Sequence, residues 1–232
     1  MSLLLLIPAA GGGQRLGSPL PKALVPVGGQ ALISVAVRAF DGIPFRSGVV
    51  LAPAGHEDSV ASAVGRRFPV RPGGATRAES VAIGVAELDP GPRDYVVIHD
   101  AARPFVSPEE VRLVIAAAEE SGAAIAVTPV ADTLKRWDGS WISGTIDRDT
   151  VTAAATPQVF RGDVLRRALE APPATDEAGR CEAAGIRVAA VPVSRRAFKI
   201  TWPEDLAIAE ALLRDLGPRP PLQMEKGSKE IR

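Results

Sequence analysis

The chain has 232 residues, 46% of them hydrophobic, and its 27 Lys and Arg balance its 27 Asp and Glu. This length and composition suit one globular domain with a sizeable core, whereas zero net charge argues against a general nucleic-acid-binding protein, which carries a basic excess. The single cysteine, Cys181, excludes an intrachain disulfide and favours a reducing, cytoplasmic location.

The first half of the chain alternates apolar runs with helical patterns. Segment 3–8 comes first; it is too short to span a membrane and is predicted to be a buried strand. Further strands are expected at 48–51, 95–99 and 123–128, and helices at 31–40, 57–68, 77–88 and 108–121. This alternation predicts an α/β fold with a mostly parallel, twisted sheet flanked by helices.

Residues 130–152 break the alternation. Two β-prone runs flank Asp138-Gly139, a pair that favours a tight hairpin turn, and no helix follows. We interpret this segment as a β-arm that leaves the domain. Trp137 and Trp141 would be exposed on such an arm, which favours packing against a partner molecule. The alternative is that both rings fold back onto their own domain.

The remainder returns to regular structure before it ends in a polar segment. Helices are expected at 162–170, 176–184 and 203–213, and a strand at 186–191. We therefore predict a single domain at 1–216. Residues 217–232 are rich in Pro, Lys and Glu without periodicity, which is typical of a disordered tail.

A glycine-rich loop, Gly11-Gly12-Gly13-Gln14-Arg15, follows the first strand. Its backbone N–H groups can approach a phosphate without side-chain obstruction, and small Ala9 and Ala10 leave room for a base or ribose. Arg15 and Lys22 supply positive charge for a triphosphate. The loop lacks the Gly-Lys-Ser/Thr of a P-loop, and a merely flexible loop is the alternative interpretation.

A second motif, His99-Asp100-Ala101-Ala102-Arg103, ends the predicted strand at 95–99. Ligands of open α/β sheets bind at such strand ends. A carboxylate beside a phosphate site suits Mg²⁺, so Asp100 is the candidate metal ligand, and Arg103 could clamp another phosphate. The alternatives are a local ion pair between Asp100 and Arg103, and a purely structural His99.

A third motif, Gly73-Gly74-Ala75-Thr76-Arg77-Ala78-Glu79-Ser80, opens the predicted helix at 77–88. Because helix N-termini bind anions, Gly73, Arg77 and Ser80 could hold a base and a phosphate. Simple capping of the helix by Thr76 is equally compatible with this motif.

The remaining polar candidates are scattered hydroxyls and cations that would suit a polyol phosphate: Thr133, Lys135, Arg148, Thr156, Thr175, Lys199 and Thr201. Capping of the next helix is the alternative for Thr175-Asp176-Glu177, and a solvated charge is the alternative for Lys135 and Arg148. With two histidines and no Cys/His pairing, zinc sites and Ser-His-Asp hydrolysis are poorly supported.

Together and in order, these motifs resemble the 2-C-methyl-D-erythritol 4-phosphate cytidylyltransferases of the non-mevalonate isoprenoid pathway. The resemblance runs from about residue 4 to 213 through AAGGGQRLG, GGATRAES, HDAARP, DTLK, TPQVF, TDEA and KITWPEDL. It implies a Rossmann-like nucleotidyltransferase domain, a homodimer built through the β-arm, and a Mg²⁺ requirement. The implied reaction transfers the cytidylyl group of CTP to 2-C-methyl-D-erythritol 4-phosphate.

The resemblance also implies a role for individual residues. Arg15, Lys22 and Lys199 would be catalytic, Asp100 would hold the metal, and Gly11, Gly74 and Ser80 would line the CTP pocket. The motifs themselves add Ala9, Ala10, Gly12, Arg77 and Asp100 to the residues expected to bind CTP. Acceptor binding would fall to Arg103, Thr133, Arg148, Thr156 and Thr175, with Thr133 and Arg148 reaching over from a partner's arm. Gln14 departs from the family, which commonly has a second basic residue there.

Three other functions remain open at this stage. The same chemistry on another polyol phosphate, such as ribitol 5-phosphate, shares the nucleotide motifs. A catalytically inactive nucleotide-binding protein is disfavoured because the candidate catalytic cations are all present. A sugar-transferring enzyme would want an Asp-x-Asp metal site; Asp147-Arg148-Asp149 has that spacing, but lies on the predicted arm.

Overall fold

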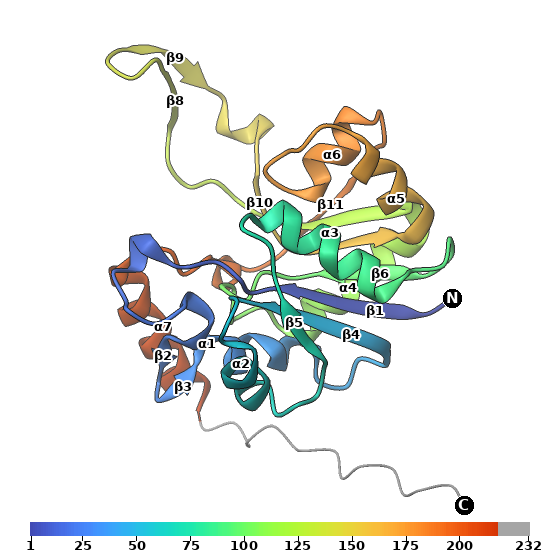
Figure 1. Ribbon diagram of the computed structural model, residues 1–232. Helices are drawn as coiled ribbons and strands as arrows, with labels where there is room; N and C mark the ends of the chain where they lie inside the picture. Colours follow the sequence, from blue (N-terminus) through green and yellow to red (C-terminus); the bar gives the residue numbers. More distant parts are fainter. Residues whose placement is uncertain (218–232) are drawn as a thin grey trace, which may run out of the picture.

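A computed structural model describes residues 1–217 and shows a seven-stranded sheet with helices on both faces (Figure 1). The strand order is β11-β7-β10-β6-β1-β4-β5. All neighbours pair in parallel except β10, which is antiparallel to both β6 and β7. The predicted α/β fold with a mostly parallel sheet is therefore confirmed. The strands are β1 Leu3–Pro8, β4 Phe45–Ala52, β5 Val70–Pro72, β6 Tyr95–Ile98, β7 Ala123–Thr128, β10 Ala153–Arg161 and β11 Ala189–Pro192.

The apolar runs of the central strands supply both cores, because successive side chains point to opposite faces. Leu5 and Ile7 of β1 pack with side chains of α1, α2, α4 and η3, whereas Leu4 and Leu6 pack with α3, α5 and α6. The helices are α1 Leu32–Ala36, α2 Glu57–Ala63, α3 Arg77–Leu88, α4 Pro108–Ser121, α5 Gly162–Glu170 and α6 Glu177–Ala183; η3 spans Val37–Phe40.

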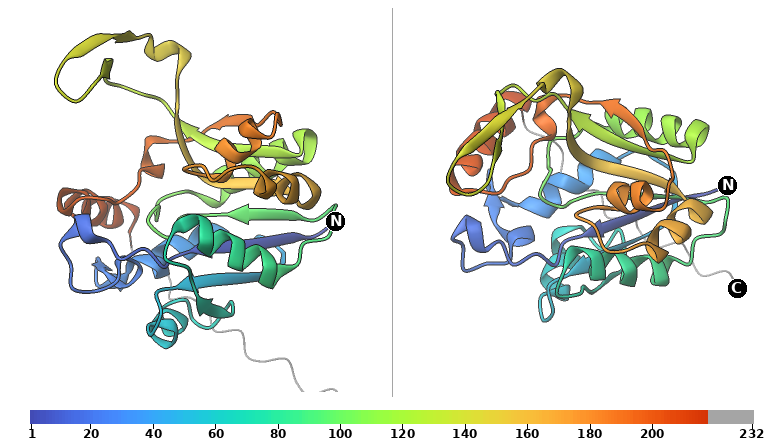
Figure 2. Two further views of the ribbon diagram at one scale, coloured as in Figure 1. Left: turned by 45° about the horizontal axis from the view of Figure 1, so that its top comes forward. Right: turned by 90° about the horizontal axis from the view of Figure 1, so that it is seen from above.

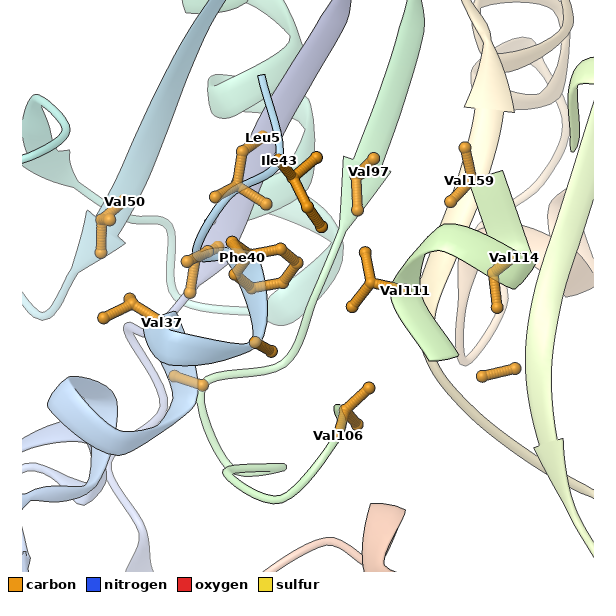
Figure 3. Close-up of a cluster of buried hydrophobic side chains, with 14 of the residues drawn as sticks. Leu5, Val37, Phe40, Ile43, Val50, Val97, Val106, Val111, Val114 and Val159 are labelled. Carbon is orange, nitrogen blue, oxygen red and sulfur yellow. The ribbon is translucent and has the colours of Figure 1, made fainter. Parts of the chain in front are cut away.

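Phe40 is fully buried at the centre of the first core, among Leu5, Val37, Ile43 and Val111 (Figure 3). Its ring also meets the edge of the His99 ring, with centroids 5.1 Å apart. The core thus extends to the residue directly before Asp100.

A third cluster joins helix α7 (Pro203–Leu216) to the small hairpin of β2 (Pro26–Val27) and β3 (Gln30–Ala31). It includes Leu16, Val27, Leu32 and Ile200. Because Leu16 follows Arg15 and Ile200 follows Lys199, this cluster anchors two segments that carry candidate catalytic cations. Short 3₁₀ turns complete the fold: η1 Gln14–Leu16, η2 Lys22–Leu24, η4 Arg148–Thr150 and η5 Arg195–Ala197.

The hairpin of β8 (Leu134–Trp137) and β9 (Ile142–Ile146) stands away from the sheet in two views (Figures 1 and 2). Trp137 and Trp141 are 69% and 77% exposed. The alternative in which both rings fold back onto their own domain is therefore wrong for this chain taken alone. The hairpin presents a large apolar surface that the rest of residues 1–217 leaves uncovered.

The structure departs from the predicted elements in a few places. Helix α2 ends at Ala63 instead of 68, because Gly65 and Arg66 adopt left-handed backbone conformations with φ of 65° and 55° that cannot continue a helix. Strands β5 and β10 have no counterpart among the predicted elements. The predicted tail at 217–232 lies, from residue 218 onward, outside the described residues. No helix within residues 1–217 has the length and apolar character needed to cross a membrane.

Candidate active site

A cavity of about 510 Å³ opens where β1 and β6 end. The residues predicted for catalysis or CTP binding line it, with the exception of Gly73: Ala9, Ala10, Gly11, Gly12, Arg15, Lys22, Gly74, Arg77, Ser80, Asp100 and Lys199. These residues come from four separate segments of the chain. The cavity also lies where ligands bind in open α/β folds, outside the carboxyl ends of parallel strands.

The glycine-rich loop forms one wall of the cavity. Gly13 has a φ of 65°, and a Cβ atom there would lie 2.8 Å from Cβ of Lys22, so glycine allows the loop to pass beside Lys22. At Gly11 and Gly12, in contrast, an added Cβ would meet no atom within 4 Å. The backbone of these two residues therefore faces open space in which a phosphate can approach.

The start of α3 forms the opposite wall. Thr76 caps the helix in a reciprocal capping box with Glu79, which confirms the capping interpretation. Ser80 lines the cavity as well, and its Oγ accepts a hydrogen bond from the Gly74 N–H at 3.1 Å. Position 73 requires glycine because its backbone passes close to Ala10: an added Cβ would lie 2.5 Å from Cβ of Ala10. Capping and cavity lining therefore coexist in this motif.

Asp100 lies on the cavity wall and is only 7% exposed. Its two carboxylate oxygens each accept a hydrogen bond, from Arg77 Nε at 2.9 Å and from Lys199 Nζ at 2.7 Å. Burial raises the pKa of Asp100, but these two cations outweigh burial and hold the pKa well below its usual range. Among residues 1–217, Asp100 pairs with Arg77 and Lys199 and not with Arg103, so the alternative of a local Asp100–Arg103 ion pair is wrong.

The backbone of Asp100 is fixed from behind by a buried chain of hydrogen bonds. Its N–H donates to Thr156 Oγ1 at 3.0 Å, and the Thr156 hydroxyl lies 3.1 Å from His99 Nδ1. His99 Nε2 lies 3.0 Å from the Arg103 carbonyl, which can only accept, so Nε2 carries the proton. Burial lowers the pKa of His99 to about 4. Fully buried and with both ring nitrogens in contact with protein groups, His99 fits the structural interpretation.

Lys22 is half-buried at the cavity, and within residues 1–217 no carboxylate forms an ion pair with it. Burial, followed by the positive charges of Lys199 and Arg15, lowers the pKa of Lys22 to about 8. Arg15 is exposed on η1, with its guanidinium carbon 5.5 Å from the centroid of the Trp202 ring. Both cations are thus available to an anion that enters the cavity.

The residues predicted for the acceptor do not line this cavity. Thr156 is buried beneath Asp100, whereas Thr175 is exposed just before α6. Arg103 donates to the carbonyl oxygens of Ala197 and Ala154, and its Nε is buried without a hydrogen-bond partner in the described structure.

Thr133 and Arg148 are exposed near the base of the β8–β9 hairpin, where Arg148 Nη1 donates to the Ala131 carbonyl. Lys135 donates to Thr145 across the hairpin, which fits a solvated arm residue. Asp147 accepts a hydrogen bond from the Asp149 N–H. Neither of these two carboxylates lines the cavity. The Asp-x-Asp spacing is therefore a turn feature.

The charges around the cavity favour an anionic ligand. Arg15, Lys22, Arg77 and Lys199 line it, and Asp100 is the carboxylate among its lining residues. Behind the wall, Arg77 Nη1 also donates to Glu177 Oε2 at 2.8 Å. Four cations therefore face two carboxylates, which leaves an excess of positive charge for phosphate groups. No cluster of three His, Cys, Asp or Glu side chains that could hold a metal occurs in residues 1–217.

Sequence reasoning missed two residues near this cavity. Glu177 was considered only within the Thr175-Asp176-Glu177 motif, as a polar acceptor candidate or a helix cap, although its carboxylate is buried and bound to Arg77. Trp202 was not singled out, although its ring lies against Arg15. A carboxylate in the first turn of a helix is an ordinary capping signal, so only the tertiary contact with Arg77 distinguishes Glu177.

Comparison with known proteins identifies the same family as the sequence motifs. The IspD family, described as 2-C-methyl-D-erythritol 4-phosphate cytidylyltransferase, matches residues 3–215. The enzyme of that name from Saccharopolyspora erythraea is 46% identical over 92% of this chain and all of its own length. Its counterpart from Burkholderia multivorans is 41% identical over 91% of this chain and 95% of its own.

A solved structure supports the same assignment. The crystal structure of 2-C-methyl-D-erythritol 4-phosphate cytidylyltransferase from Thermus thermophilus superposes with a TM-score of 0.77 and 38% identity, covering 92% of this chain and all of that one. The family match and the structural superposition both cover nearly the whole chain and indicate the same family. The chain therefore belongs to the 2-C-methyl-D-erythritol 4-phosphate cytidylyltransferase family.

Proposed function

We propose that this protein transfers the cytidylyl group of CTP to 2-C-methyl-D-erythritol 4-phosphate and releases pyrophosphate. The observation that carries the proposal is the convergence of Arg15, Lys22, Arg77 and Lys199 on one cavity beside an unobstructed glycine backbone. Such a cavity suits the triphosphate of a nucleotide. The identity of the two substrates, CTP and 2-C-methyl-D-erythritol 4-phosphate, follows from family membership.

The chemistry is an in-line displacement. An oxygen of the acceptor's phosphate attacks the α-phosphorus of CTP, and the bond from that phosphorus to the bridging oxygen breaks as pyrophosphate leaves. Attacker and target are both anions, so the barrier is dominated by charge crowding. Arg15, Lys22 and Lys199 would stabilise the charge that develops on the phosphate oxygens, and the cavity walls would hold both substrates in line.

A divalent cation, Mg²⁺, fits the site as a companion of the nucleotide. Mg²⁺ is usually held by one or two carboxylates together with substrate phosphates. Asp100 provides one carboxylate at the cavity wall, in keeping with the lack of a larger acidic cluster in residues 1–217. Asp100 would therefore hold the ion, whose chemistry is to neutralise phosphate charge.

The acceptor site requires more than this cavity, and we propose that a homodimer completes it. Thr133 and Arg148 are exposed near the hairpin, and Trp137 and Trp141 on it are uncovered. Packing of the hairpin on a second copy would bury both rings and bring Thr133 and Arg148 toward the partner's cavity. Arg103 and Thr175 would serve the acceptor from their own chain, and Thr156 would act only through Asp100, whose N–H donates to its hydroxyl.

The test is pyrophosphate release from each of the four nucleoside triphosphates, with Mg²⁺ and either 2-C-methyl-D-erythritol 4-phosphate or ribitol 5-phosphate. Release with CTP and the methylerythritol phosphate is expected. A preference for ribitol 5-phosphate would keep the mechanism and replace the acceptor. Folded protein that binds CTP but releases no pyrophosphate with any pair would show an inactive nucleotide-binding protein.

Two further measurements test the metal and the dimer. Omission of Mg²⁺ should abolish pyrophosphate release, and light scattering should give the mass of a dimer.

A further inference from the structure

Glu177 is a buried carboxylate without a role in the proposed chemistry. It is the first residue of α6 and is 1% exposed. The helix does not need it as a cap, because Asp176 Oδ1 accepts the Gly179 N–H at 2.9 Å. A buried charge is strongly destabilising unless it is paired, so the contacts that Glu177 makes must offset this cost.

The partner of Glu177 is Arg77, which is shared with the nucleotide site. One edge of the Arg77 guanidinium donates from Nη1 to Glu177 at 2.8 Å, and Nε donates to Asp100 at 2.9 Å. Lys199 contacts the other oxygen of Asp100. The result is a line of alternating charges, Lys199–Asp100–Arg77–Glu177, that joins the segment before α7, the end of β6, and the first turns of α3 and α6.

The geometry gives Glu177 control over the orientation of Arg77. A guanidinium presents its donors in a rigid, planar fork, so fixing Nη1 also fixes the direction of Nε. Arg77 lines the cavity, while Glu177 lies behind it. With Glu177 neutral, Arg77 would keep one charged partner, Asp100, and its fork would lose its second anchor.

We propose that Glu177 is a positioning residue of the nucleotide site: it anchors Arg77, and through Arg77 it sets the position and charge environment of Asp100 before the nucleotide binds. This inference rests on the proposed function for its kinetic consequences. Glu177 itself touches no substrate. Residues that orient a ligand-binding carboxylate typically change affinity or activity by about 10–100-fold when mutated.

The test compares Glu177→Gln with a matched control, Asp94→Asn. Glutamine keeps the size and an acceptor oxygen but removes the charge. Asp94 is 8% exposed, pairs with Arg46 Nη2 at 3.1 Å, and lies just before β6, at the opposite end of that strand from Asp100. Neither Asp94 nor Arg46 lines the cavity. Asp94→Asn therefore reports the effect of neutralising a buried, paired carboxylate away from the site.

We expect E177Q to lower kcat/KM for CTP about tenfold and to weaken CTP binding measured by calorimetry without acceptor. D94N should lower Tm by a similar amount and leave both quantities at wild-type values. In an Arg77→Lys background, which lacks the fork, E177Q should cause little further loss, because both changes break the same connection.

Wild-type kcat/KM and CTP affinity in E177Q, with a lowered Tm, would reduce Glu177 to a structural role and overturn the proposal. A full additional loss in the Arg77→Lys background would overturn the route through Arg77. If E177Q does not fold, E177D is measured: its carboxylate is one methylene short of Arg77, so a severalfold loss of CTP affinity is expected, and wild-type affinity would contradict the proposal. If the wild-type protein releases no pyrophosphate, the proposed function fails, but CTP calorimetry still decides the role of Glu177.

Discussion

The nucleotide side and the acceptor side of the proposed active site differ in how far one chain completes them. The residues assigned to CTP line a single cavity and are held by capped helices, close-packed glycines and buried hydrogen bonds. Those assigned to the acceptor are dispersed: Thr156 is buried beneath Asp100, Arg103 bonds to backbone carbonyls, and Thr133 and Arg148 are exposed near the hairpin.

The difference has a physical origin. Strand ends in a parallel sheet bring loops from distant parts of one chain to a common edge, so the fold alone brings together the residues that we assign to CTP. A two-stranded hairpin without a core of its own has no such constraint, and its position is fixed only by what covers it. We therefore expect mutations on the nucleotide side to act within one chain, and mutations on the arm to act across the proposed dimer.

The largest effect is expected on the nucleotide side. Lys22→Ala and Arg15→Ala each remove a cation from the developing charge on the phosphates, and loss of one such donor typically lowers kcat by about 10²–10³-fold. Steady-state pyrophosphate release measures the loss. Arg71→Ala serves as the control, since Arg71 pairs with Glu87 and does not line the cavity. Near wild-type turnover in K22A or R15A would break the assignment of the catalytic cations.

The pH dependence of kcat/KM sharpens the same assignment. Because the pKa of Lys22 is lowered to about 8, its charge is lost as pH rises through that value, and kcat/KM should fall about tenfold per unit above it. Lys22→Arg keeps its charge, so this alkaline limb should disappear from its profile.

Unfolding does not explain such a limb. Between pH 8 and the ordinary lysine value of 10.5, the unfolded chain binds more protons at Lys22 than the folded chain, so the contribution of this group to stability rises with pH. In this pH range, where Lys22 dominates the titration, kcat/KM should therefore fall while the free energy of unfolding rises. An alkaline limb that persists unchanged in Lys22→Arg would assign the titration to another group.

On the acceptor side, Arg148→Ala should raise the KM for the acceptor roughly tenfold or more, as expected for a lost hydrogen bond to a charged group worth about 1.5–3 kcal/mol. The KM for CTP should change little. Arg136→Ala is the matched control, because Arg136 is another exposed arginine on the arm. A changed CTP affinity with an unchanged acceptor KM would contradict the division of labour between the two sides.

The two sides also differ in how well the sequence predicts them. Glycine spacing, helix caps and carboxylates after apolar strands predicted the residues that line the cavity, because each signal is local. The antiparallel strand β10 was missed: its central residues 155–160 are buried on both faces, so no polar alternation marks it, and Pro157 interrupts its β pattern. The ion pair between Arg77 and Glu177 joins residues 100 positions apart and follows from packing alone.

The smallest effect concerns the exposed part of the nucleotide side. Arg15 rests against Trp202, which is 52% exposed, and a cation–π contact at an exposed site is worth about 0.5–1 kcal/mol. Trp202→Ala should therefore lower kcat/KM for CTP by about 2–5-fold, while Trp202→Phe, which keeps an aromatic face, should recover part of the loss. Equal losses in both variants would show that the indole shape matters and not its π face. An unchanged kcat/KM in Trp202→Ala would show that Arg15 finds its working position without the ring, so that positioning on this side depends on buried contacts alone.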